Sequence, residues 1–228
     1  RLDASRVLGL EQLDLGGEPP AVDEAADPRV LAERAGFDFE GWGWSHYSGL
    51  FELAVTQRWP LWPINLPRGK AMAVATANDA GWRNHLEPAE VEAIERVTSA
   101  LVLPDPDQSS LIEDLRQAHC GDIDVNVARA MARAQIARDI LMADALVRAN
   151  ERYPERRVVA IMGNQHARSD RGVGFWLEQP GMAFNGDVVS VGMLPVDSFE
   201  QLRGAASSYD FVWITDSVKR ENHCGNRA

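Results

Sequence analysis

Short apolar runs alternate along this chain with longer stretches in which apolar residues recur at helical spacing. Short runs bounded by charged residues, Gly or Pro are typical of buried strands. The pattern predicts five strands: Val7–Leu10, Trp59–Leu66, Arg156–Met162, Val188–Leu194 and Phe211–Thr215. The Arg156–Met162 run matches a parallel strand that is buried on both faces. The two prolines of Trp59–Leu66 predict an edge or irregular strand.

Helical spacing and helix-start residues account for much of the remaining chain. They predict a short helix after Asp27-Pro28, a helix capped by Ser45 that runs to about Arg58, and a helix from Arg68 to about Ala77. Gly16–Asp27 is rich in Gly, Pro and acidic residues and predicts a loop, and Gly41–Gly43 predicts a break.

The region from Leu86 to Tyr153 is predicted to be helical throughout. Its helix signals are Pro88, the stop Pro104-Asp105-Pro106, the capping box Ser110-x-x-Glu113 and the cap Asp124 of a long third helix. Gln135 and Asp139 share one face of that third helix. They predict either a face that borders a pocket or a helix contact satisfied by neighbouring arginines.

Together these elements predict an α/β fold, with a mostly parallel sheet flanked by helices and a helical insertion of about 65 residues. The predicted division is a first part of the core over residues 1–85, the insertion over 86–153 and a second part of the core over 154–228. Hydrophobic residues make up 45% of the chain, which is enough to bury a core without staples.

The formal charge of −11 argues against a nucleic-acid partner, because binding to a phosphate backbone needs clustered Lys and Arg. It leaves room for a small anionic ligand, since a few arginines in one pocket suffice. No stretch approaches the roughly 18 apolar residues of a spanning helix. The chain opens at Arg1 without Met, so we expect that a targeting segment has been removed.

The two cysteines, Cys120 and Cys224, are far apart in the sequence. Their spacing excludes a zinc ribbon and a thioredoxin motif. Spacing alone leaves two alternatives open, a disulfide or two free thiols.

The strongest candidate for chemistry is Gly163-Asn164-Gln165-His166-Ala167-Arg168, which directly follows a predicted strand. Ligands of parallel sheets bind beyond the carboxyl ends of strands. There His166 would bind a metal or move protons, and Arg168 would grip a carboxylate. Glu11, at the end of another strand, would complete a metal site or an acid/base pair with His166. The alternatives are a hydrogen-bonded loop His and a solvated Glu.

Two further segments are candidates for ligand binding. Asn65-Leu66-Pro67-Arg68 opens a helix, and such a start favours an anion such as a haem propionate, a phosphate or a carboxylate. Trp42, Trp44, His46 and Tyr47 form an aromatic group in which a Tyr phenolate would ligate haem iron. The alternatives are an ordinary helix start and a core cluster. The sequence contains no nucleophile elbow, P-loop, Gly-x-Gly-x-x-Gly or His-Glu-x-x-His motif.

The ordered set of motifs resembles the ChaN-like family of haem-binding, iron-regulated bacterial proteins. The matching segments are Leu8-Gly9-Leu10-Glu11-Gln12, Trp44-x-x-Tyr47, Asn65 to Arg68, His119-Cys120, Ala134-Gln135 through Asp139-x-x-Met142-Ala143, Gly163 to Arg168 with Gly172-Val173, and Cys224. The resemblance covers nearly the whole chain. It implies a haem-binding protein of iron uptake, which is more a binding protein than an enzyme, with Tyr47 as the iron ligand.

The resemblance also implies a location and an assembly. Family members are periplasmic proteins or outer-membrane lipoproteins that pair two haems at a dimer interface, so a homodimer is expected. Membrane contact would come only through a removed lipid anchor. An oxidising compartment favours a disulfide between Cys120 and Cys224.

The wider group, which includes TraB/Tiki-type and erythromycin-esterase-like proteins, implies the alternative function. Glu11 matches its strand-end Glu, and His166 matches the second of its two His segments. The first segment and its strand are expected upstream of Arg1. This alternative is a metal-dependent hydrolase, peptidase- or esterase-like, that holds a divalent metal with Glu11 and His166.

Two hypotheses follow for the function. In the first, haem binds near Tyr47, His46 and Trp44. Its further contacts are then Asn65, Arg68, His166 and Arg168. In the second, Glu11 and His166 act on a substrate. Both hypotheses expect Glu11, Arg68 and His166 to meet at a common rim.

Overall fold

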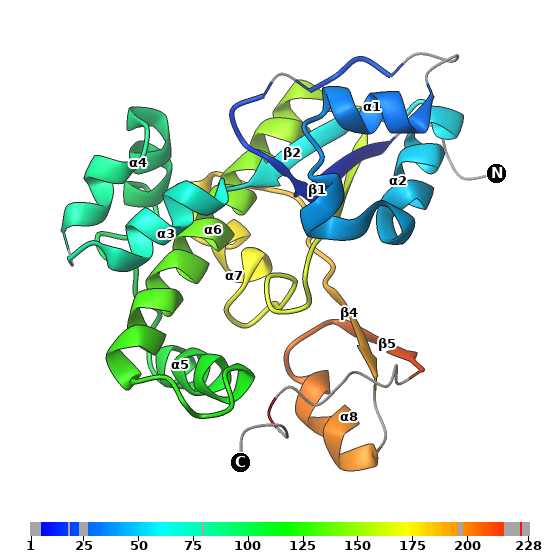
Figure 1. Cartoon of the computed structure of the whole chain (residues 1–228). Coiled ribbons are helices and arrows are strands. Elements are labelled where there is room, and N and C mark those ends of the chain that lie inside the picture. The colour runs from blue at the N-terminus through cyan, green and yellow to red at the C-terminus, as the bar shows by residue number, and fades with distance from the viewer. Residues whose placement is uncertain are drawn as a thin grey trace. The chain divides into compact units, whose positions relative to one another are not determined.

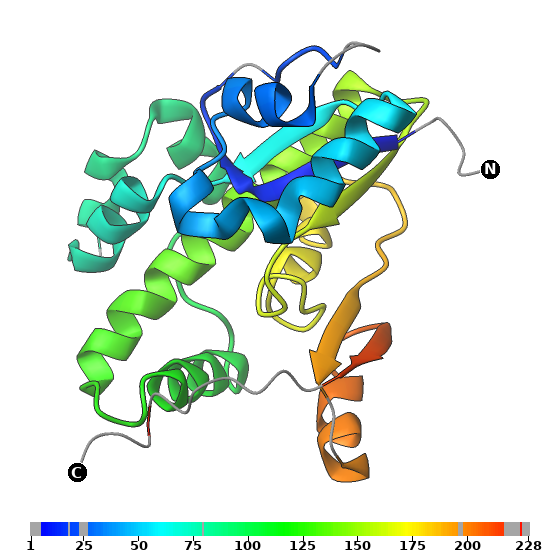
Figure 2. The same ribbon diagram turned by 45° about the vertical axis from the view of Figure 1, so that its right-hand side comes forward.

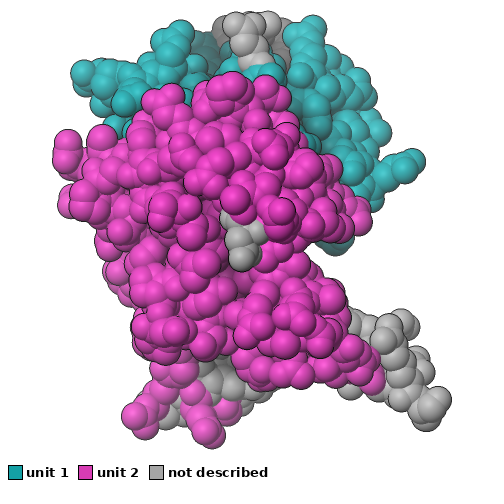
Figure 3. Space-filling model, turned by 90° about the vertical axis from the view of Figure 1, so that its left-hand side faces the viewer, with its two compact units in different colours: residues 1–67, 141–163 teal, residues 68–140, 164–228 magenta. Residues whose placement is uncertain are grey.

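The computed structural model of the chain describes residues 6–17, 19–22, 27–78, 80–195, 198–216 and 224. The chain divides into two units (Figure 3). Unit 1 consists of residues 1–67 and 141–163, and unit 2 consists of residues 68–140 and 164–228. Each unit is described by itself below.

The sheet of unit 1 has three strands in the order β2-β1-β3, and β1 is parallel to both neighbours. Its strands are β1 (Arg6–Asp14), β2 (Leu61–Asn65) and β3 (Arg157–Ile161). The central strand, β1, buries nearly all of its residues because it has a neighbour on each side. It is longer than the predicted Val7–Leu10, since its register shifts after Leu10 and pairing resumes at Asp14. Glu11 therefore lies within the strand and not at its end.

The two outer strands of this sheet differ from each other in how well they were predicted. The irregular edge strand expected over Trp59–Leu66 is confirmed in β2, which has a single sheet neighbour and carries Pro63. An edge position leaves the missing N–H of Pro63 without consequence for the ladder. The expectation that Arg156–Met162 is buried on both faces is wrong, because β3 is the other edge and is only half-buried.

Two helices and a π-helix precede β2 in unit 1 (Figure 1). They are α1 (Pro28–Arg34), η1 (Phe39–Gly43) and α2 (Trp44–Gln57). The predicted break at Gly41–Gly43 is wrong, since Asp38 caps η1 through bonds from the N–H groups of Glu40 and Gly41, 3.1 and 2.9 Å long. Ser45 lies inside α2 and is not its cap. Gly43 holds the cap position with φ 78°, a conformation that glycine adopts without strain.

The long helix α6 (Val125–Arg152) contributes to both units, with residues up to Ile140 in unit 2 and the rest in unit 1. Asp124 accepts a 2.8 Å bond from the N–H of Asn126, so the predicted cap is confirmed. In unit 1 the helix packs closely on β1, and a Cβ at Gly9 would lie 3.1 Å from Leu146 Cδ2. The predicted segments 1–85, 86–153 and 154–228 do not follow this division, because α6 belongs to both units.

The helical part of unit 2 is interrupted more often than predicted. Its elements besides α6 are α3 (Arg68–Thr76), η2 (Gly81–His85), α4 (Pro88–Glu95), α5 (Asp107–Ala118), α7 (Val173–Leu177) and η3 (Pro180–Met182). Residues 96–106 are not helical, although Leu101 and Leu103 are buried there as apolar periodicity requires. The capping box at Ser110 is wrong, since α5 already begins at Asp107.

The last two strands form a parallel sheet of their own in unit 2 (Figure 2). They are β4 (Val191–Pro195) and β5 (Phe211–Thr215), and α8 (Phe199–Ala206) connects them and packs on β5. The structure confirms an α/β fold with parallel strands, but these strands do not extend the sheet of unit 1. Among the described residues, no helix has the length and apolar character that crossing a bilayer requires.

Candidate functional site

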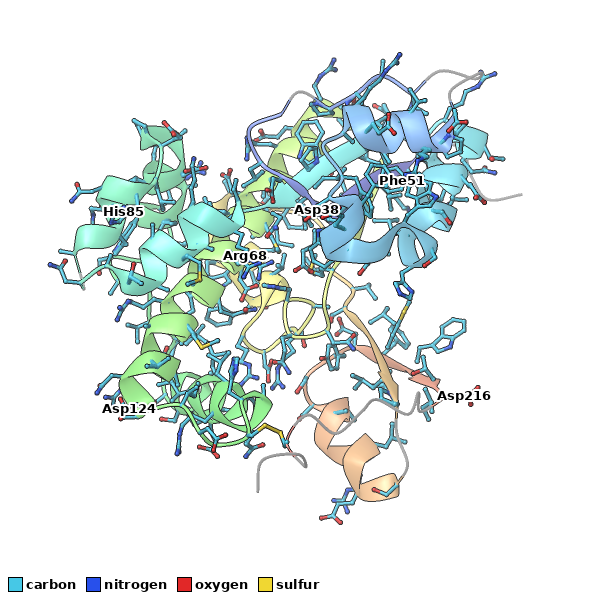
Figure 4. All side chains as sticks on the ribbon, viewed as in Figure 1. Asp38, Phe51, Arg68, His85, Asp124 and Asp216 are labelled. Atoms are coloured by element: carbon cyan, nitrogen blue, oxygen red, sulfur yellow. A yellow bond between two sulfur atoms is a disulfide. The ribbon has the colours of Figure 1, made fainter. Side chains whose placement is uncertain are left out.

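The aromatic group of unit 1 surrounds the start of α2. Tyr47 packs against Trp42 and Phe37, with ring centroids 5.8 and 5.9 Å apart. Trp44 is held between Phe37 at 5.9 Å and Phe51 at 5.5 Å. Figure 4 labels Phe51 on this helix. Because Phe37 and Phe51 are buried while Trp42, Trp44 and Tyr47 are half-buried, the group is anchored in the core and reaches the surface.

Polar residues of β1 lie beside the phenol of Tyr47. Burial raises the pKa of Tyr47, and the negative charge of Glu11 raises it further. A hydrogen bond from the Gln12 side chain acts in the opposite direction and lowers the pKa. The other end of that amide, Gln12 Oε1, is buried without a hydrogen-bond partner among the described residues. A buried acceptor without a donor is costly, and a bound ligand with a donor would remove that cost.

Glu11 has a structural partner in unit 1. Its Oε2 accepts a 2.6 Å hydrogen bond from the backbone N–H of Gly163, which lies just beyond β3. This bond explains why a carboxylate is tolerated at 5% exposure inside a strand, since charge-assisted bonds to buried carboxylates are strong.

Asn65 and His46 complete the predicted residues of unit 1. The Asn65 side-chain amide donates a 3.0 Å bond to Asp14, so it joins the ends of β2 and β1. His46 is exposed on α2 next to Tyr47. Asn65 therefore has a structural role in the sheet, whereas His46 remains accessible.

The predicted His loop of unit 2 is organised around a buried pair. His166, 5% exposed, is hydrogen-bonded through Nδ1 to the carboxylate of Asp139, itself 2% exposed. The amide of Gln135 lies 2.9 Å from the same ring nitrogen. Gln135 and Asp139 thus face the His loop, which fits the prediction that their helix face meets a functional segment.

The two arginines predicted to bind anions are placed differently. Arg168 makes a bidentate pair with Asp170, at 2.8 and 2.5 Å, so its predicted grip on a carboxylate is realised within the chain. Arg68 is the exposed first residue of α3. Since Glu11 belongs to unit 1 and Arg68 and His166 belong to unit 2, their meeting at a common rim stays a prediction.

Sequence reasoning missed three contributors. Gln12 could have been noticed as a second polar residue at the end of an apolar strand run. Arg29, whose guanidinium lies 4.5 Å from the ring centroid of Phe39 and 5.7 Å from that of Trp44, gives no local signal. Neither does Arg171, which is 2% exposed and pairs with Asp114.

The described residues contain no group of three or more His, Cys, Asp and Glu side chains placed to hold a metal ion. Glu11 and His166 instead have protein partners. The structure joins Cys120 and Cys224, the two cysteines paired by the family resemblance, through a disulfide, which leaves no free cysteine in the described part of the chain.

Comparisons with known proteins agree with this fold. The solved structure of ChaN of Campylobacter jejuni, which concerns cofacial heme binding to that protein, matches with a TM-score of 0.65 and 14% identity. The match covers 91% of this chain and 72% of that one. No curated protein matches the sequence. The model of the family described as "Haem-binding uptake, Tiki superfamily, ChaN" matches residues 2–177. Because this match spans well over half of the sequence, the chain belongs to the ChaN-type haem-binding uptake family of the Tiki superfamily.

Proposed function

We propose that this chain binds haem in bacterial haem or iron uptake and that Tyr47 is the iron ligand. Membership of a haem-binding uptake family supports the ligand. The observation that carries the proposal for this chain is the half-buried phenol of Tyr47 beside the unsatisfied acceptor of Gln12.

The residues around Tyr47 suit a ferric porphyrin. A phenolate is a known ligand of haem iron, and the positive iron would offset the burial and the Glu11 charge that raise the pKa of this phenol. The hydrogen bond from Gln12 stabilises the phenolate form. When bound, haem would supply the iron as a Lewis acid, and the protein groups would hold the phenolate in place.

The aromatic neighbours would have separate roles. Trp44 is packed between Phe37 and Phe51 and under the Arg29 guanidinium, so it stabilises the start of α2. Trp42, half-buried next to Tyr47, is the better placed ring for contact with a porphyrin. Arg29 is the cation of unit 1 that we assign to a haem propionate. Asn65, Arg68, Arg168, His46 and His166 stay predictions as further contacts.

We also propose that the protein acts in the periplasm or at the outer membrane, attached there through a lipid anchor if it is a lipoprotein. The Cys120–Cys224 disulfide supports an oxidising compartment. No observation favours the metal-dependent hydrolase suggested by Glu11 and His166, and we do not pursue it.

A hemin titration tests the function. The wild-type protein is expected to shift the Soret band saturably at micromolar hemin. Tyr47→Phe removes the ligand oxygen and is expected to weaken binding at least about tenfold, the equivalent of about 1.4 kcal/mol, with loss of the phenolate-to-iron charge-transfer band.

Tyr153→Phe is the matched control, because Tyr153 is another tyrosine of unit 1 and packs on Trp62. It should bind hemin as the wild type does. An unshifted Soret band in the wild type would refute haem binding. Equal affinities for Tyr47→Phe and Tyr153→Phe would refute the ligand assignment alone.

A further inference from the structure

The small sheet of unit 2 has one covered face and one bare apolar face. In register, Val191 pairs with Phe211 and Met193 pairs with Trp213, so these four side chains share one face. They are 40%, 64%, 55% and 67% exposed, respectively. The opposite face is occupied: Tyr209 packs on Gly192, and α8 contacts β5 (Figure 1).

This exposure is unusual for parallel strands. Parallel sheets are normally covered on both faces, because their connections place helices there. A pair of strands alone is also marginally stable. The side chains of Val191, Met193, Phe211 and Trp213 together expose on the order of 500 Å² of apolar surface, which is near the upper end for the largest patch of a monomer. Such a patch marks an interaction surface.

We propose that a second copy of this chain docks on this face, with the β4–β5 sheets of the two copies stacked face to face. The proposal concerns the haem-free protein and does not rest on the proposed function. A sheet face can pack on its own copy about 10 Å away and form a shared core. A two-fold interface needs a self-complementary surface, and a flat apolar face satisfies that requirement.

Charge and area favour a copy over other occupants. The chain carries a charge of −11, so two copies repel each other except where they meet through an uncharged surface. The face has no charged residue, since its remaining pair is Pro195 and Thr215. Each partner of a standard interface buries about 800 Å². The bare face would supply the apolar centre of such an interface, and the polar residues around it would supply the rim.

Sedimentation equilibrium of the full chain without hemin tests the proposal. The wild type is expected to reach twice the 25.2 kDa mass of one chain at micromolar concentrations. Met193→Glu places a charge in the centre of the face and is expected to raise the dimer dissociation constant at least about 30-fold, as for an interface hot spot. Trp213→Ala, which only truncates an exposed ring, should act in the same direction and covers the case in which Met193→Glu fails to fold.

Met72→Glu is the matched control, because Met72 is 57% exposed on α3 of the same unit. It should leave the dissociation constant unchanged. The proposal is overturned if the wild type stays monomeric, or if the three variants behave alike. It is also overturned if a dimer forms only with hemin and is lost in Tyr47→Phe, since the interface would then belong to the haem site.

Discussion

Gly192 marks the point where the ring of Tyr209 crosses β4. A Cβ at this position would lie 2.8 to 2.9 Å from ring atoms of Tyr209, closer than carbon atoms approach each other without repulsion. The buried ring of Tyr209 is also fixed at its other end, because its hydroxyl donates a 2.9 Å bond to the carbonyl of Asn164. The absence of a side chain at Gly192 therefore permits this packing.

Gly192→Ala is expected to lower the free energy of unfolding by about 1–3 kcal/mol, as overpacking does. Gly49→Ala is the matched control, since Gly49 lies in α2 and a Cβ there would meet nothing within 4 Å. That change should raise stability by about 0.5–1 kcal/mol, because alanine is the better helix former. Urea unfolding followed by circular dichroism measures both variants. Equal stability of Gly192→Ala and the wild type would show that the Tyr209 ring can move aside.

At the scale of elements, the His loop is attached to its surroundings by polar side chains. His166 and Asp139 join the loop to α6. Asn164 exchanges two bonds with the backbone of Met193, at 2.6 and 3.1 Å, and thereby joins the loop to β4. Arg171 joins it to α5 through Asp114 and through a 2.9 Å bond to Ser110. Since these bonds replace apolar packing, the order of the loop depends on each partner being present.

His166→Ala is expected to destabilise the protein by about 3–5 kcal/mol, because it leaves the buried Asp139 carboxylate without its partner. Asp139→Asn in the same chain removes that unpaired charge and should restore part of the loss. A double-mutant cycle in urea therefore predicts a coupling energy above about 1 kcal/mol. Strictly additive effects would mean that the two side chains do not stabilise each other.

At the scale of the whole molecule, the disulfide closes a large loop. Cys120 follows α5, and its partner Cys224 is 104 residues later (Figure 4, yellow bond). Cross-linking mainly restricts the unfolded chain, and the effect grows with the length of the loop.

Replacing both cysteines, with Cys120→Ser and Cys224→Ser, is expected to cost up to about 4–5 kcal/mol on the chain-entropy account. Thermal unfolding with and without a reductant measures this change. The reductant should lower the melting temperature of the wild type and leave that of the double variant unchanged. A wild type insensitive to full reduction would contradict the prediction.

The amino-acid sequence by itself determined the elements whose signals are local. The run of β1, the edge character of β2 and the Asp124 cap of α6 depend on residues near one another in the chain, so their patterns could be interpreted directly. The aromatic residues at the start of α2 were also visible, because they are adjacent in the sequence.

Only the tertiary structure decided what depends on residues far apart in the chain. The bond from Gly163 to Glu11, the packing of Tyr209 on Gly192 and the separate β4–β5 sheet have no local signal. Gln12 became a candidate only when its amide was found beside Tyr47. The physical reason is the same in each case: a buried polar or aromatic group takes whichever partner the packed chain brings to it, and composition does not encode that partner.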